Sequence, residues 1–389
     1  GPGLPLPPSP ATAAVSTLGP GLLPAPAHPV TPPSLIFGGY GVLTIPTSGP
    51  SGVVTSTSKP VGIATGPLAG PLRTRTFSSA VRGIAANAAG DIAVVIEPCA
   101  TRVSGCHPAA PALLLARRGH SFGKPIPITS TKGHAYGAAV AIDPRGRVLV
   151  AWDREGSVYA RFASTTGRFT PIQRLGPEHG RSTFQAVLPG DGRAAVGWTS
   201  QNVSEGDATS PFTASVSLAG PSRHFARARV LETVQRTGTG RYVPYQGLVV
   251  RLPTGQPGLV AWTGYSGAHY VVRAASIVGT SVAAPETVST PAVDTVLADA
   301  AEGTRGQAIV LILPGRAGAD PPIGSQPAGL AGVTRPTSGQ PFGPPEQIVP
   351  APEFIDGAAV GIDPASGAAF ATWRDVGAPI GWSIRTSLG

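Results

Sequence analysis

The sequence contains no methionine, only two cysteines and only three lysines, Lys59, Lys124 and Lys132, among 389 residues. Its formal net charge of +9 therefore comes almost entirely from arginine, and the arginines are scattered without a basic run or interleaved aromatic residues. Such scatter is typical of a solvated surface rather than of a nucleic-acid platform. No stretch approaches the roughly 20 apolar residues of a membrane-spanning helix. We therefore expect neither a nucleic acid partner nor a membrane span.

The two cysteines, Cys99 and Cys106, lie close together with only His107 beside them. This spacing lacks the paired ligands of a zinc site, and we expect no metal and no cofactor. An even pair that closes one short loop predicts a disulfide, and hence an extracellular or cell-surface location. Two unpaired thiols are the alternative. Because the chain begins with Gly1 rather than Met, we also expect a processed or tag-cleaved product from which any signal peptide is already gone.

Glycine and proline, in contrast, are abundant, with 52 and 44 residues placed between short apolar runs. This composition is typical of many short strands joined by tight turns. A unit of strand, turn and strand recurs, in which a Trp follows the turn glycine by six or seven residues. The four copies are Gly146 with Trp152, Gly192 with Trp198, Gly255 with Trp262, and Gly367 with Trp373. We interpret these tryptophans as packing residues.

A further strand in each unit is marked by an aromatic residue that is usually followed by proline. The markers are Phe77, Phe122, Phe169, Phe225 and Phe342, with Val282 in the one gap, at intervals of 45 to 60 residues. This interval predicts blades of a β-propeller, and the prolines place the marked strand at the outer edge, where a missing N–H is harmless. We predict an all-β propeller of about seven four-stranded blades that open near residues 40, 81, 135, 183, 245, 293 and 356. The first unit, with strands at 42–46, 53–58 and 61–65, is weak, and without it the count is six.

The two ends of the chain do not match. The last unit stops after its third strand, while residues 21–31, which include Leu22 and Leu23, resemble an outer strand. We predict that 21–31 closes the ring beside residues 380–388, so that the propeller domain is 21–389. Residues 1–20 form a Pro/Gly-rich arm in which 11–19, with Val15 and Leu18, look like a surplus strand. Such a strand can add to a sheet of another copy and build a filament, and a flexible tether is the alternative.

The recurring Asp, Gly and Trp resemble those of bacterial extracellular β-propeller proteins of the sialidase and WD40 kind. The resemblance implies the architecture and, as an alternative function, glycan binding or hydrolysis. The sialidase motif Ser-x-Asp-x-Gly-x-Thr-Trp is absent, because Asp143 and Gly146 are three positions apart and Trp152 lies further on. We interpret Asp143 and Asp363 as turn residues whose carboxylates cap local N–H groups. Shared architecture does not transmit function.

A ligand site is expected at the mouth of the central channel, where the inner strands begin. The mixture of acids, bases and aromatics there suits a sugar or a peptide loop; the residues are Arg82, Tyr136, Arg181, Gln185, Tyr245, Asp294 and Asp356. The alternative is that these side chains only bond to one another. Glycosidase chemistry needs two carboxylates at a defined separation, which for this set are Asp294 and Asp356.

No nucleophile elbow or phosphate-binding loop occurs, and no helix is predicted. His134, His179, His224 and His269 are evenly spaced, but only the first two share a position in the repeat. We interpret the spacing as coincidence and find no catalytic residue. The sequence favours a non-enzymatic, secreted or surface module that self-assembles through its arm. Its partner would be a second copy, another extracellular protein or a glycan; the alternative is a carbohydrate-binding or glycoside-hydrolase propeller.

Overall fold

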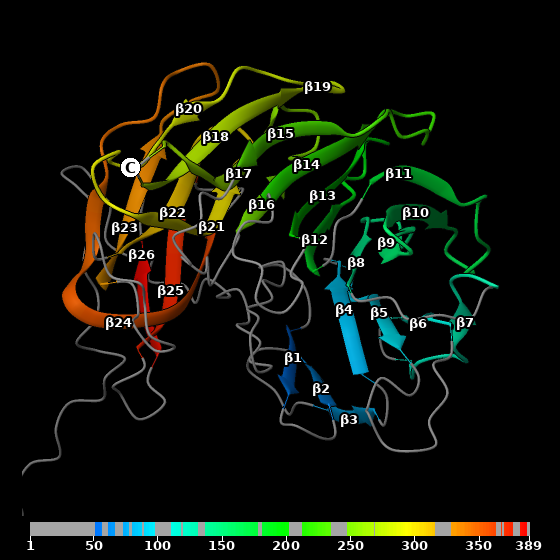
Figure 1. The fold of residues 1–389 in the computed structure, drawn as a ribbon. Coiled ribbons are helices and arrows are strands. Elements are labelled where there is room, and N and C mark those ends of the chain that lie inside the picture. The colour runs from blue at the N-terminus through cyan, green and yellow to red at the C-terminus, as the bar shows by residue number, and fades with distance from the viewer. Residues whose placement is uncertain are drawn as a thin grey trace, which may run out of the picture.

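The computed structural model is built from antiparallel β-sheets (Figure 1). It describes residues 51–56, 61–66, 73–77, 80–87, 89–97, 110–117, 120–130, 137–177, 181–201, 212–234, 247–267, 269–315, 328–362, 367, 369–375 and 382–386. All regular elements in these ranges are strands, as the composition predicted. A helix of the length and apolarity needed to cross a membrane is not found among them.

Sheets B to F each have four strand positions, and in each sheet the strands follow one another as an up-and-down meander. Sheet B contains β4 (Ala80–Ala86), β5 (Ile92–Glu97), β6 (Ala112–Ala116) and β7 (Ile126–Pro127). Sheet C contains β8 (Ala138–Ile142), β9 (Val148–Arg154), β10 (Ser157–Ala163) and β11 (Gln173–Pro177). Sheet D contains β12 (Arg181–Val187), β13 (Ala194–Gln201), β14 (Phe212–Ala219) and β15 (Arg229–Val234). Sheet E contains β16 (Leu248–Arg251), β17 (Gly258–Tyr265), β18 (Tyr270–Val278) and, both beside β18, β19 (Ser281–Val282) and β20 (Glu286–Thr287).

The last two sheets share a strand. Sheet F contains β21 (Thr295–Glu302), β22 (Ala308–Pro314), β23 (Ala328–Arg335) and the first part of β24 (Glu346–Ile362). The second part of β24 is the first strand of sheet G, where it pairs with β25 (Ala369–Asp375), which pairs with β26 (Trp382–Thr386). Sheet A comes first in the sequence and contains β1 (Ser51–Ser56), β2 (Val61–Gly66) and β3 (Arg73–Phe77).

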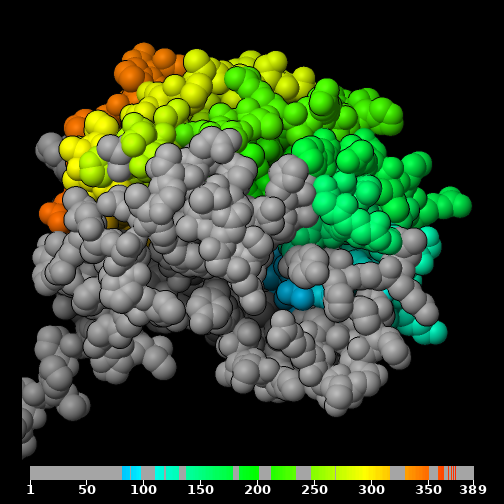
Figure 2. All heavy atoms as spheres, viewed as in Figure 1, coloured from blue at the N-terminus to red at the C-terminus, as the bar shows by residue number. Residues whose placement is uncertain are grey.

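The sheets are arranged like the blades of a propeller. The first strand of each sheet contacts the first strand of the next, in the order β4, β8, β12, β16, β21 and β24. In Figure 1 the sheets follow one another along an arc, from sheet B in blue and cyan through green and yellow to sheet F. Figure 2 shows the same arc as a continuous packed surface of described atoms. The fold is therefore an all-β, propeller-like one, as the repeat predicted.

The apolar core is divided into layers, one between each pair of neighbouring sheets. Separate clusters of buried side chains join sheets B and C, C and D, D and E, E and F, and F and G. In β9, Val148, Val150 and Trp152 enter the layer toward sheet B, while Leu149 and Ala151 enter the layer toward sheet D. Because successive side chains of a strand point to opposite faces, a strand packed on both faces is apolar throughout. This explains the unbroken apolar runs of the sequence.

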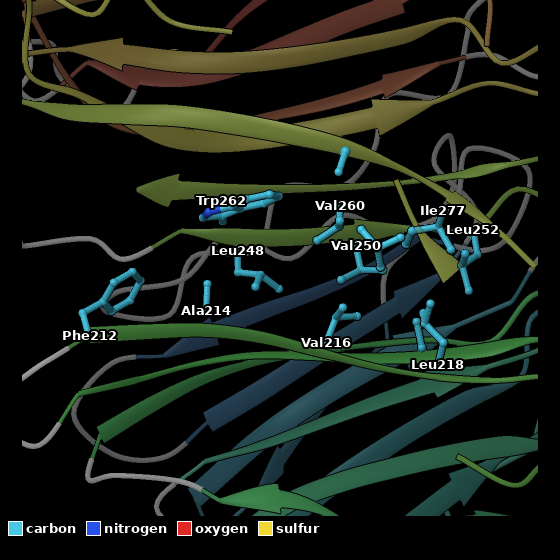
Figure 3. Close-up of a cluster of buried hydrophobic side chains, with 13 residues drawn as sticks. Phe212, Ala214, Val216, Leu218, Leu248, Val250, Leu252, Val260, Trp262 and Ile277 are labelled. Atoms are coloured by element: carbon cyan, nitrogen blue, oxygen red, sulfur yellow. The ribbon is translucent and has the colours of Figure 1, made fainter. Parts of the chain in front are cut away.

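The repeated tryptophans belong to these layers. Figure 3 shows Trp262 of sheet E packed with Leu248 and with Phe212 of sheet D. Trp152, Trp198, Trp262 and Trp373 are all at most 4% exposed. The Trp198 indole N–H donates to the Pro177 carbonyl of the preceding sheet at 3.3 Å, so the ring also fixes a hydrogen bond between sheets. The prediction that these tryptophans are packing residues is confirmed.

The two ends of the strands form rims of different kinds. At the end that we call the turn rim, first and second strands are joined by the short turns 87–91, 143–147, 188–193, 252–257 and 303–307. In one of them the Asp143 carboxylate accepts from the backbone N–H groups of Arg145 and Arg147 at 2.9 and 2.8 Å, which is the cap that the sequence predicted. Gly146 has φ +79° there, a conformation that favours glycine.

The opposite end, the loop rim, carries the connections from second to third strands and from each sheet to the next. The second-to-third connections of sheets B, D and F are 98–111, 202–211 and 315–327, and residues 235–247 join sheet D to sheet E. Antiparallel strand order places all four at the same end of the sheets.

One detail of the sequence prediction is corrected. The strands expected at 53–58 and 61–65 are β1 and β2, and β3, which ends at Phe77, is the marked strand expected after them; residues 42–46 lie outside the described residues. In sheets B, C, D and F the outer strand begins four residues after its aromatic marker, as β11 does after Phe169, whereas Phe77 and Val282 lie within β3 and β19. Phe169 already forms an isolated bridge with Ala163, and the continuous ladder starts beyond Pro171, which lacks an N–H. Residues 1–31, Cys99 and Cys106 also lie outside the described residues.

Candidate functional site

The structure places the predicted channel-mouth residues in separate sets of contacts. Arg82 is in β4, Gln185 in β12, and Asp294 just before β21. Arg181 begins β12 and Asp356 lies in β24, both described by backbone alone, whereas Tyr136 and Tyr245 lie outside the described residues.

Arg82 is bound within its own sheet. Its Nε and Nη2 atoms lie 2.7 and 2.5 Å from Oε2 of Glu97, which is fully buried at the end of β5. A buried carboxylate with a guanidinium partner is a stabilised ion pair as long as both members are present. Arg82 is therefore a structural partner of Glu97 at the loop rim.

Asp294 belongs to a group of polar and aromatic side chains on the loop rim that we call the rim cluster. Its members are Glu232, Tyr265, His269, Tyr270, Arg273 and Asp294. Asp294 Oδ1 accepts from the Tyr270 N–H at 2.8 Å and lies 3.4 Å from His269 Nδ1. The rings of Tyr265 and Tyr270 are tilted against each other with centroids 5.4 Å apart. A carboxylate, an imidazole and two phenol rings are thus gathered at one corner.

Glu232 holds the other side of the rim cluster. It lies in β15 of sheet D, and its carboxylate accepts from the Trp262 indole N–H at 2.8 Å and from the Tyr265 N–H at 3.0 Å, both in sheet E. Arg273 Nε lies 3.4 Å from the same carboxylate. A Cβ at Gly264 would come within 2.3 Å of Glu232 Oε2, so the glycine leaves the space that the carboxylate occupies. Glu232 therefore joins sheets D and E at the loop rim.

Gln185 belongs to a second group, the inner belt, which consists of Gln185, Arg251, Asp299 and the backbone N–H of Val360. Arg251 Nη1 donates to Gln185 Oε1 at 3.2 Å, and Arg251 Nη2 donates to Asp299 Oδ1 at 2.7 Å. Asp299 Oδ2 accepts from the Val360 N–H at 3.0 Å. Each member is on the first strand of a different sheet, so the belt connects sheets D, E, F and G.

The inner belt also satisfies backbone groups at the free edges of first strands. Gln185 Oε1 of sheet D accepts from the Val250 N–H of sheet E at 3.3 Å. In the same way, Asp299 Oδ2 of sheet F accepts from the Val360 N–H of sheet G. Burial raises the pKa of Asp299, and the Arg251 guanidinium and two backbone N–H groups oppose this change. The belt thus combines edge capping with charge pairing, and we regard it as structural.

A third polar group is buried at the turn rim between sheets E and F. The side chains of Glu302 and Arg335 are 0% and 2% exposed, with Oε1 and Nη2 2.8 Å apart, and Arg335 Nη1 donates to Ser276 Oγ at 2.9 Å. Burial raises the pKa of Glu302 to about 8, against the lowering effect of Arg335. Among the described residues, Glu302 Oε2 and Arg335 Nε have no hydrogen-bond partner.

The described residues contain no group of three or more His, Cys, Asp or Glu side chains that could hold a metal ion. Of the groups above, the rim cluster has the composition of a binding site, because it joins half-buried aromatic and charged side chains at a loop-bearing end. It is our candidate functional site.

Sequence reasoning found one member of the rim cluster, Asp294, and missed the others. His269 was noticed only for its even spacing from other histidines, although its position between two tyrosines was the better signal. In the inner belt, Arg251 and Asp299 were missed, yet an Asp inside the apolar strand β21 signals a buried charge that needs a partner.

No protein-family model matches this sequence, and no curated protein sequence matches it. Solved structures of similar fold include the β-propeller domain of the trilobed protease from Pyrococcus furiosus, at 10% identity and a TM-score of 0.47, over 91% of this chain and 94% of that chain. The polysaccharide lyase Uly1 is similar at 9% identity and a TM-score of 0.48, over 88% of this chain and 89% of that one. An α-L-arabinanase from Penicillium chrysogenum follows at 12% identity and a TM-score of 0.38, over 73% and 85%. Likeness of this degree transfers no activity. The expected resemblance holds for the propeller-like fold alone.

Proposed function

We propose that this protein is a non-enzymatic interaction module that binds its partner at the loop rim. The observation that carries the proposal is the difference between the two rims. At the turn rim, first and second strands are joined by five or six residues, and the third-to-fourth connections 164–172, 220–228 and 336–345 have nine or ten, whereas the longest connections, 98–111, 235–247 and 315–327, have thirteen or fourteen residues and join strands at the loop rim. Binding residues are usually carried on loops that a rigid scaffold positions.

The charged groups of the described residues support a scaffold rather than a catalyst. Asp299 is engaged with Arg251, Glu302 with Arg335, and Glu232 with Trp262, each between strands or sheets. Catalysis by acid, base or nucleophile needs such groups to converge on one reacting atom. Here they are spread over both rims and the inner belt.

The proposal extends to the whole chain. We propose seven sheets as blades, residues 21–31 closing the last one beside β26, and residues 11–19 adding as a strand to a second copy. A disulfide between Cys99 and Cys106 and an extracellular or surface location belong to the same proposal. An exported module that joins copies of itself would then display its loop rims to another extracellular protein or a glycan.

Removing the arm tests self-assembly. We expect a variant that lacks residues 1–20 to be a single molecule by light scattering, whereas the full chain forms elongated assemblies in electron micrographs. A variant that lacks only residues 1–10 is the matched control, because it keeps the 11–19 strand, and it should assemble like the full chain. An assembly state that does not change when residues 1–20 are removed would exclude the filament.

The loop rim is tested by exchanging one connection at each end. Residues 202–211 on the loop rim are replaced by a Gly-Ser loop of equal length, and the turn 220–223 at the turn rim is replaced in the same way. Both variants are applied to arrays of glycans and extracellular proteins. Loss of binding only in the 202–211 variant supports the proposal, and equal behaviour of the two contradicts it.

A carbohydrate-binding or hydrolysing propeller is the second candidate, and the rim cluster favours it. Half-buried tyrosines beside a carboxylate are a suitable surface for a sugar ring. A glycan array and a hydrolase screen, repeated with Tyr265→Ala and Asp356→Ala, separate the candidates. Turnover that Asp356→Ala abolishes would make the protein an enzyme, and an absence of binding and turnover on every glycan would remove this candidate.

A further inference from the structure

In each sheet from B to F, a segment leaves the third strand at the turn rim and runs back along the outside of that strand. We call these the return segments, and they are 120–125 (the described part in sheet B), 164–172, 220–228, 279–285 and 336–345. Each donates the same backbone hydrogen bond to its third strand, at 2.8 or 2.9 Å, from Gly123, Thr170, Ala226, Ala283 and Gly343. The return segments therefore occupy equivalent places in five successive sheets.

Charge is distributed unevenly over the return segments. Those of sheets B, C and D contain basic residues and no acid, whereas those of sheets E and F contain no charged residue. Lys124, Arg168 and Arg227 are exposed, one in each of the three basic segments, and we call them the basic strip. Lys124 and Arg227 hold the same position, one residue after the donor of the shared hydrogen bond. Residues far apart in the sequence thus place like charge at equivalent sites.

The three basic segments are in contact with their neighbours. Arg117, just after β6 of sheet B, donates from its guanidinium to the Thr165 carbonyl in the segment of sheet C. The side chain of Gln173, in β11 of sheet C, donates to the Arg223 carbonyl and accepts from the Phe225 N–H in the segment of sheet D, both at 2.9 Å. In Figure 1 the strands that follow these segments, β7, β11 and β15, lie in this order along the outside of the arc. The basic strip is therefore one surface that crosses three sheets.

The charge of the basic strip is not neutralised by an acid within the described residues of sheets B, C and D. The acids at the turn rim of these sheets are each bound by an arginine outside the strip, in the pairs Asp91 with Arg117, Asp143 with Arg147, and Asp191 with Arg193. A surface of one sign attracts ligands of the opposite sign. The partner that suits the strip is therefore a polyanion.

The aromatic rings beside the basic strip are engaged in packing. Arg161 Cζ lies 4.3 Å from the centroid of the Phe169 ring, and Phe225 is stacked on Phe162 at 5.6 Å. Arg223 Cζ lies 5.9 Å from the Phe162 centroid, so this arginine also belongs to the packing. Single-stranded nucleic acids are bound by stacking of bases on aromatic faces, whereas guanidinium groups bind carboxylates and related anions directly. An anionic polysaccharide is therefore favoured over a nucleic acid.

We propose that the basic strip binds a linear anionic polysaccharide along the outside of sheets B, C and D. Because stacked sheets lie about 10 Å apart, the strip presents its charges in a row that an extended polymer can follow. The strip begins at the turn rim, at the opposite end of the sheets from the loop rim. Binding there is independent of the partner proposed for the loop rim.

Binding of defined polymers to the full chain tests the basic strip. The probes are polygalacturonate, which carries carboxylates, dextran sulfate, which carries sulfates, and neutral dextran. We expect the protein to bind at least one of the anionic polymers at about 50 mM salt and to bind it much more weakly at about 200 mM, because salt screens exposed charges. The polymer that binds identifies the anionic group. Lys124→Gln, Arg168→Gln and Arg227→Gln combined should raise the Kd about tenfold, the effect of losing three exposed ion pairs.

Arg168→Gln and Arg305→Gln form a matched pair of single variants. Each removes one exposed arginine from the turn rim, but Arg305 lies in the 303–307 turn of sheet F, outside the basic strip. We expect the Kd to rise about twofold in Arg168→Gln and to stay the same in Arg305→Gln. Equal effects would overturn the proposal, because the attraction would then depend on net charge alone.

Three further results would also overturn it. They are an absence of binding to both anionic polymers, binding of neutral dextran as tight as that of the anionic polymers, and tighter binding of single-stranded DNA that the triple variant loses. The Tm of the triple variant should equal that of the wild type, because the three side chains are exposed. A higher Kd at an unchanged Tm assigns the loss of binding to the strip.

Discussion

At the scale of single residues, the contacts between sheets depend on a few buried carboxylates. Glu232 is the clearest case, because it accepts hydrogen bonds from one side chain and one backbone group of the next sheet. Removing such an acceptor leaves buried donors without a partner, which costs more than the hydrogen bonds themselves contributed.

Glu232→Ala should therefore lower the free energy of unfolding by about 2–4 kcal/mol, since the Trp262 indole N–H and the Tyr265 N–H lose their acceptor. Urea unfolding followed by tryptophan fluorescence measures the change. Glu155→Ala is the control, because the Glu155 side chain is 73% exposed and forms an ion pair with its neighbour Arg154, and its effect should stay within about 0.5 kcal/mol. Similar losses in both variants would show that Glu232 does not join the sheets.

Glu302 predicts the pH dependence of stability. Burial raises its pKa to about 8 in the folded state from an ordinary value of 4.5. Between these values the folded protein binds more protons than the unfolded chain, so stability is highest near the lower pH and falls as the pH rises toward 8. The slope from one such group is at most about 1.4 kcal/mol per pH unit. The raised pKa of Asp299 acts in the same direction.

Glu302→Gln reproduces the protonated side chain and should flatten this fall, while leaving the stability near pH 5 almost unchanged. Urea titrations between about pH 5 and about pH 8 measure the slope of both proteins. An unaltered slope in the variant would mean that Glu302 stays ionised beside Arg335 across the range.

At the scale of elements, strand order and turns were predictable from the sequence because both depend on local chemistry. The turn glycines at 146, 192, 255 and 367 all have positive φ, which only glycine adopts without strain. The fusion of two predicted strands into β24 was not predictable. Pro350 and Pro352 suggest a break, yet an edge strand tolerates them because it needs fewer N–H donors.

Alanine substitutions at two of these glycines distinguish the cost of backbone strain from the cost of steric crowding. A Cβ at Gly255 meets nothing within 4 Å, whereas one at Gly146 would lie 2.2 Å from Arg117 Nη1 and 2.8 Å from Asp91 Oδ2. Gly255→Ala should cost about 1–2 kcal/mol of stability through φ alone. Gly146→Ala should cost more, because it also displaces the ion pair between Arg117 and Asp91, whose Nη1 and Oδ2 are 2.9 Å apart. Equal costs by thermal unfolding would contradict this distinction.

At the scale of the whole molecule, the layered core could be predicted and the polar contacts could not. Apolar runs such as that of β9 require burial on both faces, which already implies stacked sheets. The inner belt joins Gln185, Arg251 and Asp299 over long stretches of sequence, and no local pattern specifies which charge meets which. The same holds for Glu232 and Trp262 in the rim cluster.

Closure of the proposed ring gives the prediction at this scale. If residues 21–31 pair beside β26, a variant that lacks residues 1–31 should lose several degrees of Tm and the exchange protection of β26, because an outer strand and its apolar contacts are removed. The variant that lacks only residues 1–20 should keep both. A Tm that is the same in the two variants would mean that the last sheet is complete without the N-terminal segment.

The shared strand β24 restricts how this molecule can change and how it can come apart. Neighbouring sheets B to E are joined by separate connections, so a unit could be inserted or lost there without breaking a hydrogen-bonded ladder. Sheets F and G have one uninterrupted backbone in common, paired with β23 at one end and β25 at the other. Duplication at that junction would have to cut a strand, and tension on the C-terminal sheet is carried directly into its neighbour. The two sheets are therefore mechanically coupled through one strand.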